Sequence, residues 1–254
     1  MVSSHDINIL GSVLSSSIRL WRGTLGRKKS DQPAQLPMLF DRENDSACRL
    51  VREAFTELNL DAMIYPVPDG GNRHLARLEA LSGAKTVPFL FDPNTGQKCQ
   101  GAAAILDYVF AQYGKGPVPT LLRPGVLNRT LSLLAGHIRG HKGELAAKGQ
   151  SADKPLTLYS FESSPYSRPV RERLCELELA YHLVNLSKQQ IADLGPATQR
   201  LHLGEYRPLP DSKRARFLAQ QGRVQVPFLV DPNTGQSLFE SKIILDYLTR
   251  TYAT

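Results

Sequence analysis

The stretch VPFLFDPNTGQ at residues 87–97 recurs as VPFLVDPNTGQ at residues 226–236, with one substitution in eleven positions. In each copy, an apolar run entered through proline is followed by Asp-Pro-Asn-Thr-Gly. Proline fixes φ near the value that a turn needs and glycine accepts a positive φ, so this motif predicts a tight hairpin between two strands. A repeat of this kind indicates that the chain contains two copies of one structural unit.

The repeat continues on both sides of the hairpin. Downstream, ILDY at 105–108 recurs at 244–247. Upstream, ACRLVREAFTELNL at 47–60 aligns without a gap on YSRPVRERLCELEL at 166–179. The upstream pair predicts a first helix in each copy, and the downstream pair predicts a closing helix.

Short apolar runs mark the other strands. LPMLF and LTLYS precede the first helix of each copy, and DAMIYPV and AYHLVNL follow that helix closely. A strand, helix and strand so tightly connected imply a parallel pair with a right-handed crossover. We expect these strands at 36–40, 61–67, 156–160 and 180–186, and the closing helices at 102–113 and 241–252.

A leader segment precedes each copy. IRLWRGTL at 18–25 resembles IRGHKGEL at 138–145. Counted from Leu14 in the first leader and from Leu134 in the second, the matched positions have spacings of 4, 3 and 4, which mark one face of a helix. One of these positions is Trp21 in the first leader and His141 in the second. We interpret each leader as a helix that either packs on its own lobe or joins the two lobes.

Length and composition fit this organisation. The 254 residues suit one large domain or two small ones, with 41% hydrophobic and 22% charged residues. No apolar run reaches the roughly 18 residues of a membrane span, and the first basic residue follows the N-terminal apolar stretch, unlike in a signal peptide. We therefore expect a soluble cytoplasmic protein. Its expected divisions are a leader helix and linker at 1–35, lobe 1 at 36–114, a linker with the second leader at 115–154, and lobe 2 at 155–254.

The net charge of +7 is concentrated in the leaders. Residues 12–30 hold five basic side chains and no acidic one, and residues 120–150 hold five against one. A basic helix can meet nucleic acid or an anionic membrane surface, or it can present a solvated face. We expect no nucleic-acid partner, and we keep open a contact with a membrane surface or a protein partner through Arg19, Arg22 and Lys28.

The cysteines and histidines offer little chemistry. Cys48, Cys99 and Cys175 form no CxxC pair and no even set, which argues against a disulfide framework and a zinc ribbon. We expect buried thiols. His137 and His141 have a spacing that places both on one helix face, but no third ligand is near, so we predict no metal site.

The order of elements resembles the thioredoxin fold, and more closely the glutaredoxins and the N-terminal domain of glutathione S-transferases. The signature of those families is a Cys-Pro-Tyr-Cys or serine-containing loop, Arg-x-Val-Arg on a helix, Val-Pro with a cis bond, and Glu-Ser before the last helix. Lobe 2 matches it at Ser164-Pro165-Tyr166-Ser167, Arg168 to Arg171, Val226-Pro227 and Glu240-Ser241.

Lobe 1 matches the signature less completely. It has Asp45-Ser46-Ala47-Cys48, Arg49 to Arg52 and Val87-Pro88, with Gly101-Ala102 in place of Glu-Ser. The chain thus resembles proteins with tandem glutathione-transferase N-terminal domains. The resemblance implies an α/β fold of two tandem thioredoxin-like (βαβ-ββα) lobes, each preceded by a leader helix, without the all-helical second domain of those transferases.

The resemblance also implies a glutathione site in lobe 2, with glutathione as substrate or ligand. Ser164 would act as the catalytic residue, by hydrogen-bonding a bound thiolate at the start of a helix whose N–H groups and dipole stabilise negative charge. The peptide edge at Val226 would pair with an extended peptide, Glu240 would meet an amine, and Ser241 would meet a carboxylate. The expected binding residues are Ser164, Tyr166, Val226, Pro227, Glu240 and Ser241.

Plainer interpretations remain for the same residues. Ser164 and Ser241 could be ordinary helix caps. Arg168 and Arg171 could be solvated or paired with acids on their own helix.

The departures from the family signature restrict the chemistry. Glutaredoxin exchange needs a cysteine at the first loop position, which is Ser164 in lobe 2 and Asp45 in lobe 1. We therefore expect no dithiol oxidoreductase activity. Lobe 1 is expected to be a structural partner with a degenerate pocket.

Lobe 2 carries an insert of about 20 residues, because 60 positions separate Ser167 from Pro227 against 40 from Cys48 to Pro88. A connection of that length is often functional. Its polar side chains could line a cleft for an anion or coat a solvated loop. The residues concerned are Arg200, Tyr206, Arg207 and Arg214.

Two functions therefore follow from the sequence. The first is a glutathione-binding protein, or a glutathione transferase that acts on an unknown electrophile through lobe 2. The alternative is a catalytically inert tandem module that binds a protein partner or an anionic surface.

Overall fold

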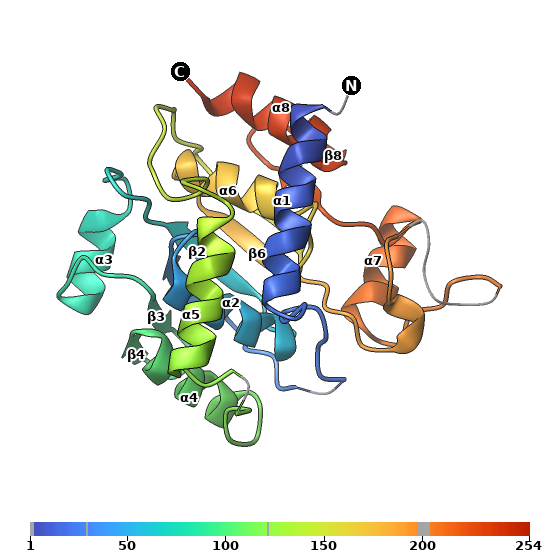
Figure 1. Cartoon of the computed structure of the whole chain (residues 1–254), viewed down its shortest axis with the longest axis horizontal. Coiled ribbons are helices and arrows are strands. Elements are labelled where there is room, and N and C mark those ends of the chain that lie inside the picture. The colour runs from blue at the N-terminus through green and yellow to red at the C-terminus, as the bar shows by residue number, and fades with distance from the viewer. Residues whose placement is uncertain (1–2, 29, 121, 198–203) are drawn as a thin grey trace.

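The repeat in the sequence folds into two lobes of the predicted topology. The computed structural model describes residues 3–28, 30–120, 122–197 and 204–254 (Figure 1). Lobe 1 consists of β1 (Met38–Asp41), α2 (Ser46–Glu57), β2 (Ala62–Pro66), α3 (Leu75–Ser82), β3 (Phe89–Asp92), β4 (Gln97–Gln100) and α4 (Ala102–Gln112). Lobe 2 consists of β5 (Leu156–Ser160), α6 (Arg168–Glu176), β6 (Tyr181–Asn185), the 3₁₀ turn η1 (Ile191–Asp193), α7 (Lys213–Gln221), β7 (Phe228–Asp231), β8 (Gln236–Phe239) and α8 (Ser241–Tyr252).

The strands of both lobes form one sheet of eight strands in the described chain, with the order β4-β3-β1-β2-β6-β5-β7-β8. β1 and β2 are parallel, as are β5 and β6, which confirms the predicted pairs. The lobes meet where β2 pairs with β6 in antiparallel register. There, Met63 faces His182, its own counterpart in the aligned repeat, so this pair marks a local two-fold axis.

In each lobe, hydrogen bonds join the side chains of the hairpin motif and of the ILDY motif, which explains why the two motifs are repeated as a pair. In lobe 1, the Asp92 carboxylate accepts hydrogen bonds from the Asn94 peptide N–H at 2.9 Å and from the Tyr108 hydroxyl at 2.7 Å. In lobe 2, Asp231 makes the same bonds to Asn233 at 2.8 Å and Tyr247 at 2.6 Å. The turn thus caps itself and attaches the closing helix to the sheet.

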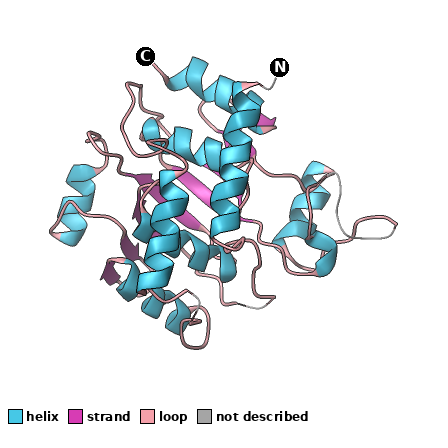
Figure 2. Cartoon of the chain, viewed as in Figure 1, coloured by secondary structure: helices cyan, strands magenta, loops and turns pink. Residues whose placement is uncertain are grey.

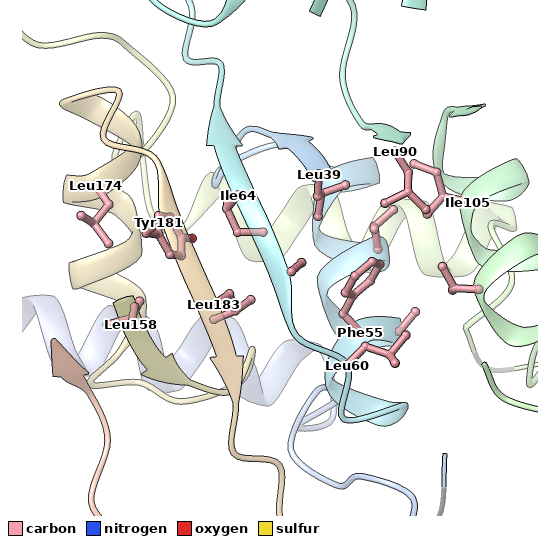
Figure 3. Packing of buried hydrophobic residues seen from close by; sticks show 14 of the residues in the cluster. Leu39, Phe55, Leu60, Ile64, Leu90, Ile105, Leu158, Leu174, Tyr181 and Leu183 are labelled. Carbon is pink, nitrogen blue, oxygen red and sulfur yellow. The ribbon is translucent and has the colours of Figure 1, made fainter. Parts of the chain in front are cut away.

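One hydrophobic core extends through both lobes. Figure 3 shows side chains from the two lobes beside β2 and β6, with Ile64 from one and Tyr181 and Leu183 from the other. Smaller clusters, containing Leu78 of α3 and Phe217 of α7, lie apart from this core. Helices surround the strands in Figure 2, and α3 and α7 lie at opposite flanks of the molecule in Figure 1.

The prediction of a helix in the matched segments 18–25 and 138–145 is wrong, because both segments are almost entirely turns that follow the helices α1 (Ser4–Ile18) and α5 (Val126–His137). Helix and turns together join the two lobes, which is the second of the two alternatives expected. After α1, Arg19 pairs with Glu53 of lobe 1 at 2.6 Å, while Ser16 Oγ donates to the Ser163 carbonyl of lobe 2 at 2.9 Å. The second leader does the converse, because Arg139 pairs with Glu172 of lobe 2 and Ser132 bonds to lobe 1.

The segment after each leader helix continues across to the opposite lobe. Leu25 forms a parallel bridge with Lys188 of lobe 2, and the matched Leu145 forms one with Asp69 of lobe 1. The first leader, which lobe 1 follows directly in the sequence, therefore contributes backbone to lobe 2. No helix within the described ranges is long and apolar enough to cross a lipid bilayer.

Candidate functional site

The loop before α6 carries the first predicted site residue. The Ser164 hydroxyl accepts a hydrogen bond from the Ser167 N–H at 3.3 Å, and its peptide N–H donates to the Phe161 carbonyl at 3.1 Å. Ser164 is not the helix cap of the plainer interpretation, because the N-cap of α6 is Ser167; Ser164 instead closes the turn that precedes the helix. A hydroxyl that accepts one bond keeps its own proton, so Ser164 can still donate to a ligand.

The backbone before β7 offers an open peptide edge. The Val226-Pro227 bond is cis, as is the matched Val87-Pro88 bond of lobe 1. The family signature includes a cis bond at Val-Pro, so the resemblance predicted both. In the described chain, no hydrogen bond to the peptide groups of Val226 is present. This edge can pair with an extended peptide in the way that an added strand does.

The start of α8 supplies two more groups. Glu240 has φ of 69°, a conformation that is uncommon outside glycine, and its counterpart in lobe 1 is Gly101 with φ of 81°. The Glu240 side chain does not cap α8, and its carboxylate accepts a hydrogen bond from Gln225. The Ser241 hydroxyl lies 3.2 Å from His5 Nε2 of the first leader.

All six predicted binding residues line one cavity of about 610 Å³. This volume falls within the range of roughly 300–1,000 Å³ that is common for small-molecule sites. The cavity is lined by Trp21, Thr24, Phe161, Ser164, Pro165, Tyr166, Lys188, Asp193, Leu194, Gly195, Pro196, Ala197, Arg214, Val224, Gln225, Val226, Pro227, Glu240 and Ser241.

Sequence reasoning missed the part of this lining that comes from the first leader. Trp21 and Thr24 reach the cavity because the chain after α1 crosses to lobe 2. The matched leaders differ at this position, with tryptophan in one and histidine in the other. The difference between Trp21 and His141 could have indicated that the two leaders have different surroundings, but the sequence did not show which lobe each leader would contact.

The insert of lobe 2 forms another wall of the cavity, through residues 193–197. The sequence left open whether four side chains of the insert line a cleft for an anion or coat a solvated loop, and neither alternative describes all of them, although Arg214 does line the cavity. Arg214 is buried and donates to the Ser187 carbonyl at 2.9 Å and the Leu186 carbonyl at 2.7 Å, while Tyr206 donates to Asp193 at 2.5 Å. Arg207 is exposed and pairs with Glu205, and Arg200 lies outside the described residues.

The expectation that Arg168 and Arg171 are solvated or paired with acids on their own helix is wrong. Arg171 and Arg168 are neither solvated nor paired along their helix, because both are buried and their carboxylate partners lie in the loops before α2 and α6. Arg171 pairs with Glu43 at 2.9 Å and with Glu162 at 3.0 Å. The matched Arg52 of lobe 1 pairs with Glu162 at 3.0 Å and Glu43 at 3.4 Å.

These pairs form a buried cluster around the two-fold axis, to which each lobe contributes both signs of charge. We call Asp41, Glu43, Arg52, Glu162, Arg168 and Arg171 the central charge cluster. Burial raises the pKa of Asp41 to about 6, whereas Arg171 and Arg52 lower the pKa of Glu162 to about 2 despite its burial. The cluster holds the lobes together and does not line the cavity.

The basic leaders are less exposed than expected. Arg19 and Arg139 are buried in their ion pairs with Glu53 and Glu172, and Arg22 is half-buried. Lys28 is exposed, and Lys29 lies outside the described residues. Arg19 therefore cannot contact a membrane or a partner, which weakens the alternative function based on a basic leader face.

In lobe 1, an acidic side chain occupies the N-terminus of the first helix, α2. The Asp45 carboxylate accepts hydrogen bonds from the Ala47 N–H at 2.9 Å and the Cys48 N–H at 2.8 Å, so it occupies the place where an anion would be stabilised. Burial and the nearby carboxylates raise the pKa of the Cys48 thiol. All three cysteines are free and buried, as expected. The thiolate needed for exchange chemistry is therefore disfavoured at Cys48.

The histidine pair in the second leader does not gather ligands. His141 lies 3.0 Å from Glu144 Oε2 on the exposed surface, and His137 is also exposed. Within the residues that the structure describes, no group of three or more histidine, cysteine or acidic side chains could hold a metal ion.

Comparison with protein families supports the architecture. The family model for the glutathione S-transferase N-terminal domain matches residues 42–123 and again residues 158–254. The comparisons with curated proteins and with solved structures returned no match. The two matched segments cover most of the chain and coincide with the two thioredoxin-like lobes, so the chain belongs to the glutathione S-transferase N-terminal domain family and contains that domain twice.

Proposed function

We propose that lobe 2 binds glutathione in the cavity beside Val226-Pro227. The observation that carries this proposal is that one cavity of about 610 Å³ brings together four features. They are the Val226 peptide groups, without a hydrogen bond in the described part of the chain, the hydroxyls of Ser164 and Ser241, and Glu240 with its positive φ. Membership of a family named for glutathione transfer supports it.

The chemical groups of glutathione suit this arrangement. The central peptide of the ligand would pair with the Val226 backbone. The amine of the γ-glutamyl group would meet the Glu240 carboxylate, and its carboxylate would meet the Ser241 hydroxyl and the start of α8. Ser241 can serve both a carboxylate and His5, because a hydroxyl has one proton and two acceptor sites.

Glu240 provides a separate argument from the backbone. A non-glycine residue in a sparsely populated conformation with positive φ is held there at a free-energy cost of roughly 1–3 kcal/mol. Lobe 1 avoids this cost with Gly101. Strain of this kind concentrates at functional sites, so the retention of glutamate in lobe 2 supports a binding role for its carboxylate.

We further propose that the site promotes transfer of glutathione to an electrophile. Bound glutathione would supply a thiol nucleophile. Ser164 would donate its hydroxyl proton in a hydrogen bond to the sulfur, and the N–H groups at the start of α6 would lower the pKa of the thiol. Lobe 1 cannot do the same, because Asp45 occupies its helix start and would repel a thiolate.

Titration calorimetry with glutathione tests the binding. We expect saturable heat at millimolar ligand, and about tenfold weaker affinity for Ser241→Ala, since loss of a hydrogen bond to a charged group weakens binding by roughly 1.5 kcal/mol. Ser237→Ala is the matched control, because Ser237 is exposed on β8 and does not line the cavity. Absence of heat in the wild type, or equal affinities in wild type and Ser241→Ala, would contradict the proposal.

The thiolate role of Ser164 has its own readout. The ultraviolet absorbance of the bound thiolate, followed against pH, gives the pKa of the bound thiol. We expect that pKa to lie below the value of free glutathione and to rise in Ser164→Ala. An unchanged pKa in Ser164→Ala would limit Ser164 to capping the turn.

A further inference from the structure

The helices α1 and α5 bury polar side chains, whereas a surface helix ordinarily turns its apolar side toward the core. The buried residues of α1 are all serines, namely Ser12, Ser15 and Ser16. In α5, Asn128 and Ser132 are buried. Ser12 and Ser132 hold matched positions in the two leaders, so both helices share this inverted arrangement.

The buried polar groups bond the two helices to each other. The Ser15 hydroxyl donates to a backbone carbonyl of α5 at 2.9 Å. Directly after α1, Arg19 donates to the Asn128 carbonyl at 3.0 Å, and after α5, Arg139 donates to the Asn8 carbonyl at 2.8 Å. The end of each helix therefore lies beside the start of the other, and Figure 1 shows the two helices alongside each other in front of the sheet.

The outward sides of the two helices are apolar. Six apolar side chains, each between 42% and 62% exposed, are Ile7, Leu10 and Leu14 of α1 and Leu133, Leu134 and Ile138 at the end of α5. We call these six side chains the outer apolar face. The spacings of 3 and 4 place the α1 members on one side of that helix, and the packing of α1 beside α5 joins both sets into one surface.

This surface has no role in holding the lobes together, because the inward sides of the helices make those contacts. Leu14 and Leu134 are matched in the repeat and are 56% and 51% exposed, so both leaders contribute to the outer apolar face at the same position. A contiguous exposed apolar surface with a polar border marks a site of interaction with a protein or a membrane.

Basic side chains border the outer apolar face. Arg129 is exposed on α5. Arg22 and Lys142 each donate to an asparagine of the leader helices, at 2.8 Å near the start of α5 and at 3.0 Å near the start of α1. The two helices contain one acidic residue, Asp6, whose carboxylate accepts a hydrogen bond from the Ser3 hydroxyl at 2.8 Å.

The charges decide between two coverings of this surface. A second copy of the chain would bring the basic border of one face against that of the other, and like charges across an interface oppose association. A bilayer with anionic headgroups offers apolar groups to the outer apolar face and negative charge to its border. Helices that lie in the plane of a membrane surface use this combination of apolar and basic residues.

We propose that the outer apolar face docks on the surface of a lipid bilayer that carries anionic headgroups. In this contact, the apolar side chains enter the boundary between headgroups and acyl chains, and Arg22, Arg129 and Lys142 lie among the headgroups. The contact differs from the one expected from the basic leaders, because it depends on apolar side chains and leaves Arg19 buried. It does not depend on the proposed glutathione site.

Co-sedimentation of the full chain with vesicles tests this proposal. We expect binding to vesicles made of equal parts phosphatidylcholine and phosphatidylglycerol. Affinity for phosphatidylcholine alone should be at least about tenfold weaker, because each basic side chain near an anionic surface adds attraction. Added salt should reduce this difference, since salt screens exposed charges.

Variants locate the contact on the molecule. Leu14→Ser combined with Leu134→Ser should weaken binding to the mixed vesicles at least about tenfold, because two apolar side chains no longer leave water. Arg129→Glu should reduce the preference for the anionic vesicles. Ile191→Ser is the matched control, because Ile191 is 73% exposed on η1, outside the outer apolar face, and this variant should bind as the wild type does. Unfolding by denaturant shows whether each variant is folded.

Three results would overturn the proposal. The first is no binding of the wild type to the mixed vesicles, or equal binding to both kinds of vesicle. The second is unchanged binding in the Leu14→Ser, Leu134→Ser variant. The third is a dimer of the wild type in sedimentation equilibrium without lipid that becomes a monomer in that variant, because a second copy would then cover the face.

Discussion

Lobe 1 and lobe 2 have the same topology and the same cis proline, but they treat the start of their first helix in opposite ways. In lobe 1, the Asp45 carboxylate binds the free N–H groups of α2. In lobe 2, the matched Ser164 brings a neutral hydroxyl and a cavity opens in front of it. The comparison indicates that the two copies share one scaffold and differ at the start of the first helix, where lobe 2 has the cavity of about 610 Å³.

The two lobes are nearly symmetric in their shared interior. Arg52 and Arg171 hold equivalent places in the central charge cluster, and each contacts both Glu43 and Glu162. The outer surroundings break this symmetry. The first leader and the insert both build on lobe 2, so the copies differ most where a ligand would be held.

The largest expected effect is a loss of stability when Arg171 or Arg52 of the central charge cluster is replaced. Arg171→Met leaves Glu43 and Glu162 short of a buried partner, and loss of one partner of a buried ion pair lowers stability by about 3–5 kcal/mol. Arg52→Met should lower the free energy of unfolding by a similar amount. Denaturant unfolding measures both.

The exposed pair Arg207–Glu205 provides the control for this experiment. Arg207→Met should change the free energy of unfolding by less than about 1 kcal/mol. A loss below about 1 kcal/mol for either Arg171→Met or Arg52→Met would show that the central charge cluster does not join the lobes.

The second prediction uses an asymmetry within that cluster. Asp41 of lobe 1 corresponds to Ser160 of lobe 2 in the aligned repeat, and burial raises the pKa of Asp41 to about 6 from its usual value of 3.8. Because the folded state holds this proton more tightly, the Asp41 contribution favours folding below pH 4 and is lost as the pH rises to 6. The loss should be roughly 2–3 kcal/mol.

Unfolding curves between pH 4 and pH 7 for wild type and Asp41→Asn measure this contribution. Relative to the variant, the wild type should lose stability as the pH rises through this window. Parallel curves for the two proteins would mean that Asp41 keeps an ordinary pKa in the folded state.

The third prediction exchanges a residue of lobe 2 for its counterpart in lobe 1. Glu240→Gly should weaken glutathione binding about tenfold, because the ligand amine loses its carboxylate partner. The same change should raise the free energy of unfolding by about 0.5–1 kcal/mol, since glycine adopts φ of 69° without strain.

Lys115→Gly is the matched control, because Lys115 is exposed and has φ of 52° away from the cavity. It should raise stability comparably and leave the affinity for glutathione unchanged. If Glu240→Gly binds as the wild type does, the strain at Glu240 has no link to glutathione.

The smallest expected effect concerns the pair Cys48 and Ser167, which occupy matched positions. In the described chain, the buried Ser167 Oγ has no hydrogen-bond partner. Ser167→Cys should therefore raise the free energy of unfolding by about 0.5–1 kcal/mol, because a buried hydroxyl without a partner is unfavourable. Cys48→Ser should lower it by a similar amount. Destabilisation by Ser167→Cys would reveal a polar partner for that hydroxyl.

Much of the fold was predictable because it depends on local signals that occur twice. The Asp-Pro-Asn-Thr-Gly turn, the apolar runs and the helix periodicity gave the elements of each lobe, and the parallel pairs followed from the short crossover. The junction between β2 and β6 was not predictable. It depends on which sheet edges meet, and no turn or spacing in the sequence records that.

The candidate site was predictable where motif and backbone coincide, at Ser164, Val226-Pro227 and Glu240-Ser241. It was not predictable where the lining comes from distant chain, as with Trp21 and residues 193–197. Arg168 and Arg171 were misread for a related reason. A charged residue on a helix looks solvated until its partners, here Glu43 and Glu162 in loops, are placed beside it.

A crystal structure of the protein grown with saturating glutathione tests the central claim most directly. The account predicts one tripeptide per chain, beside Val226-Pro227, with its sulfur near Ser164 and its γ-glutamyl group at Glu240 and Ser241. The matched place beside Val87-Pro88 should hold no tripeptide. Glutathione bound in lobe 1, or no glutathione in the cavity of lobe 2, would contradict the account.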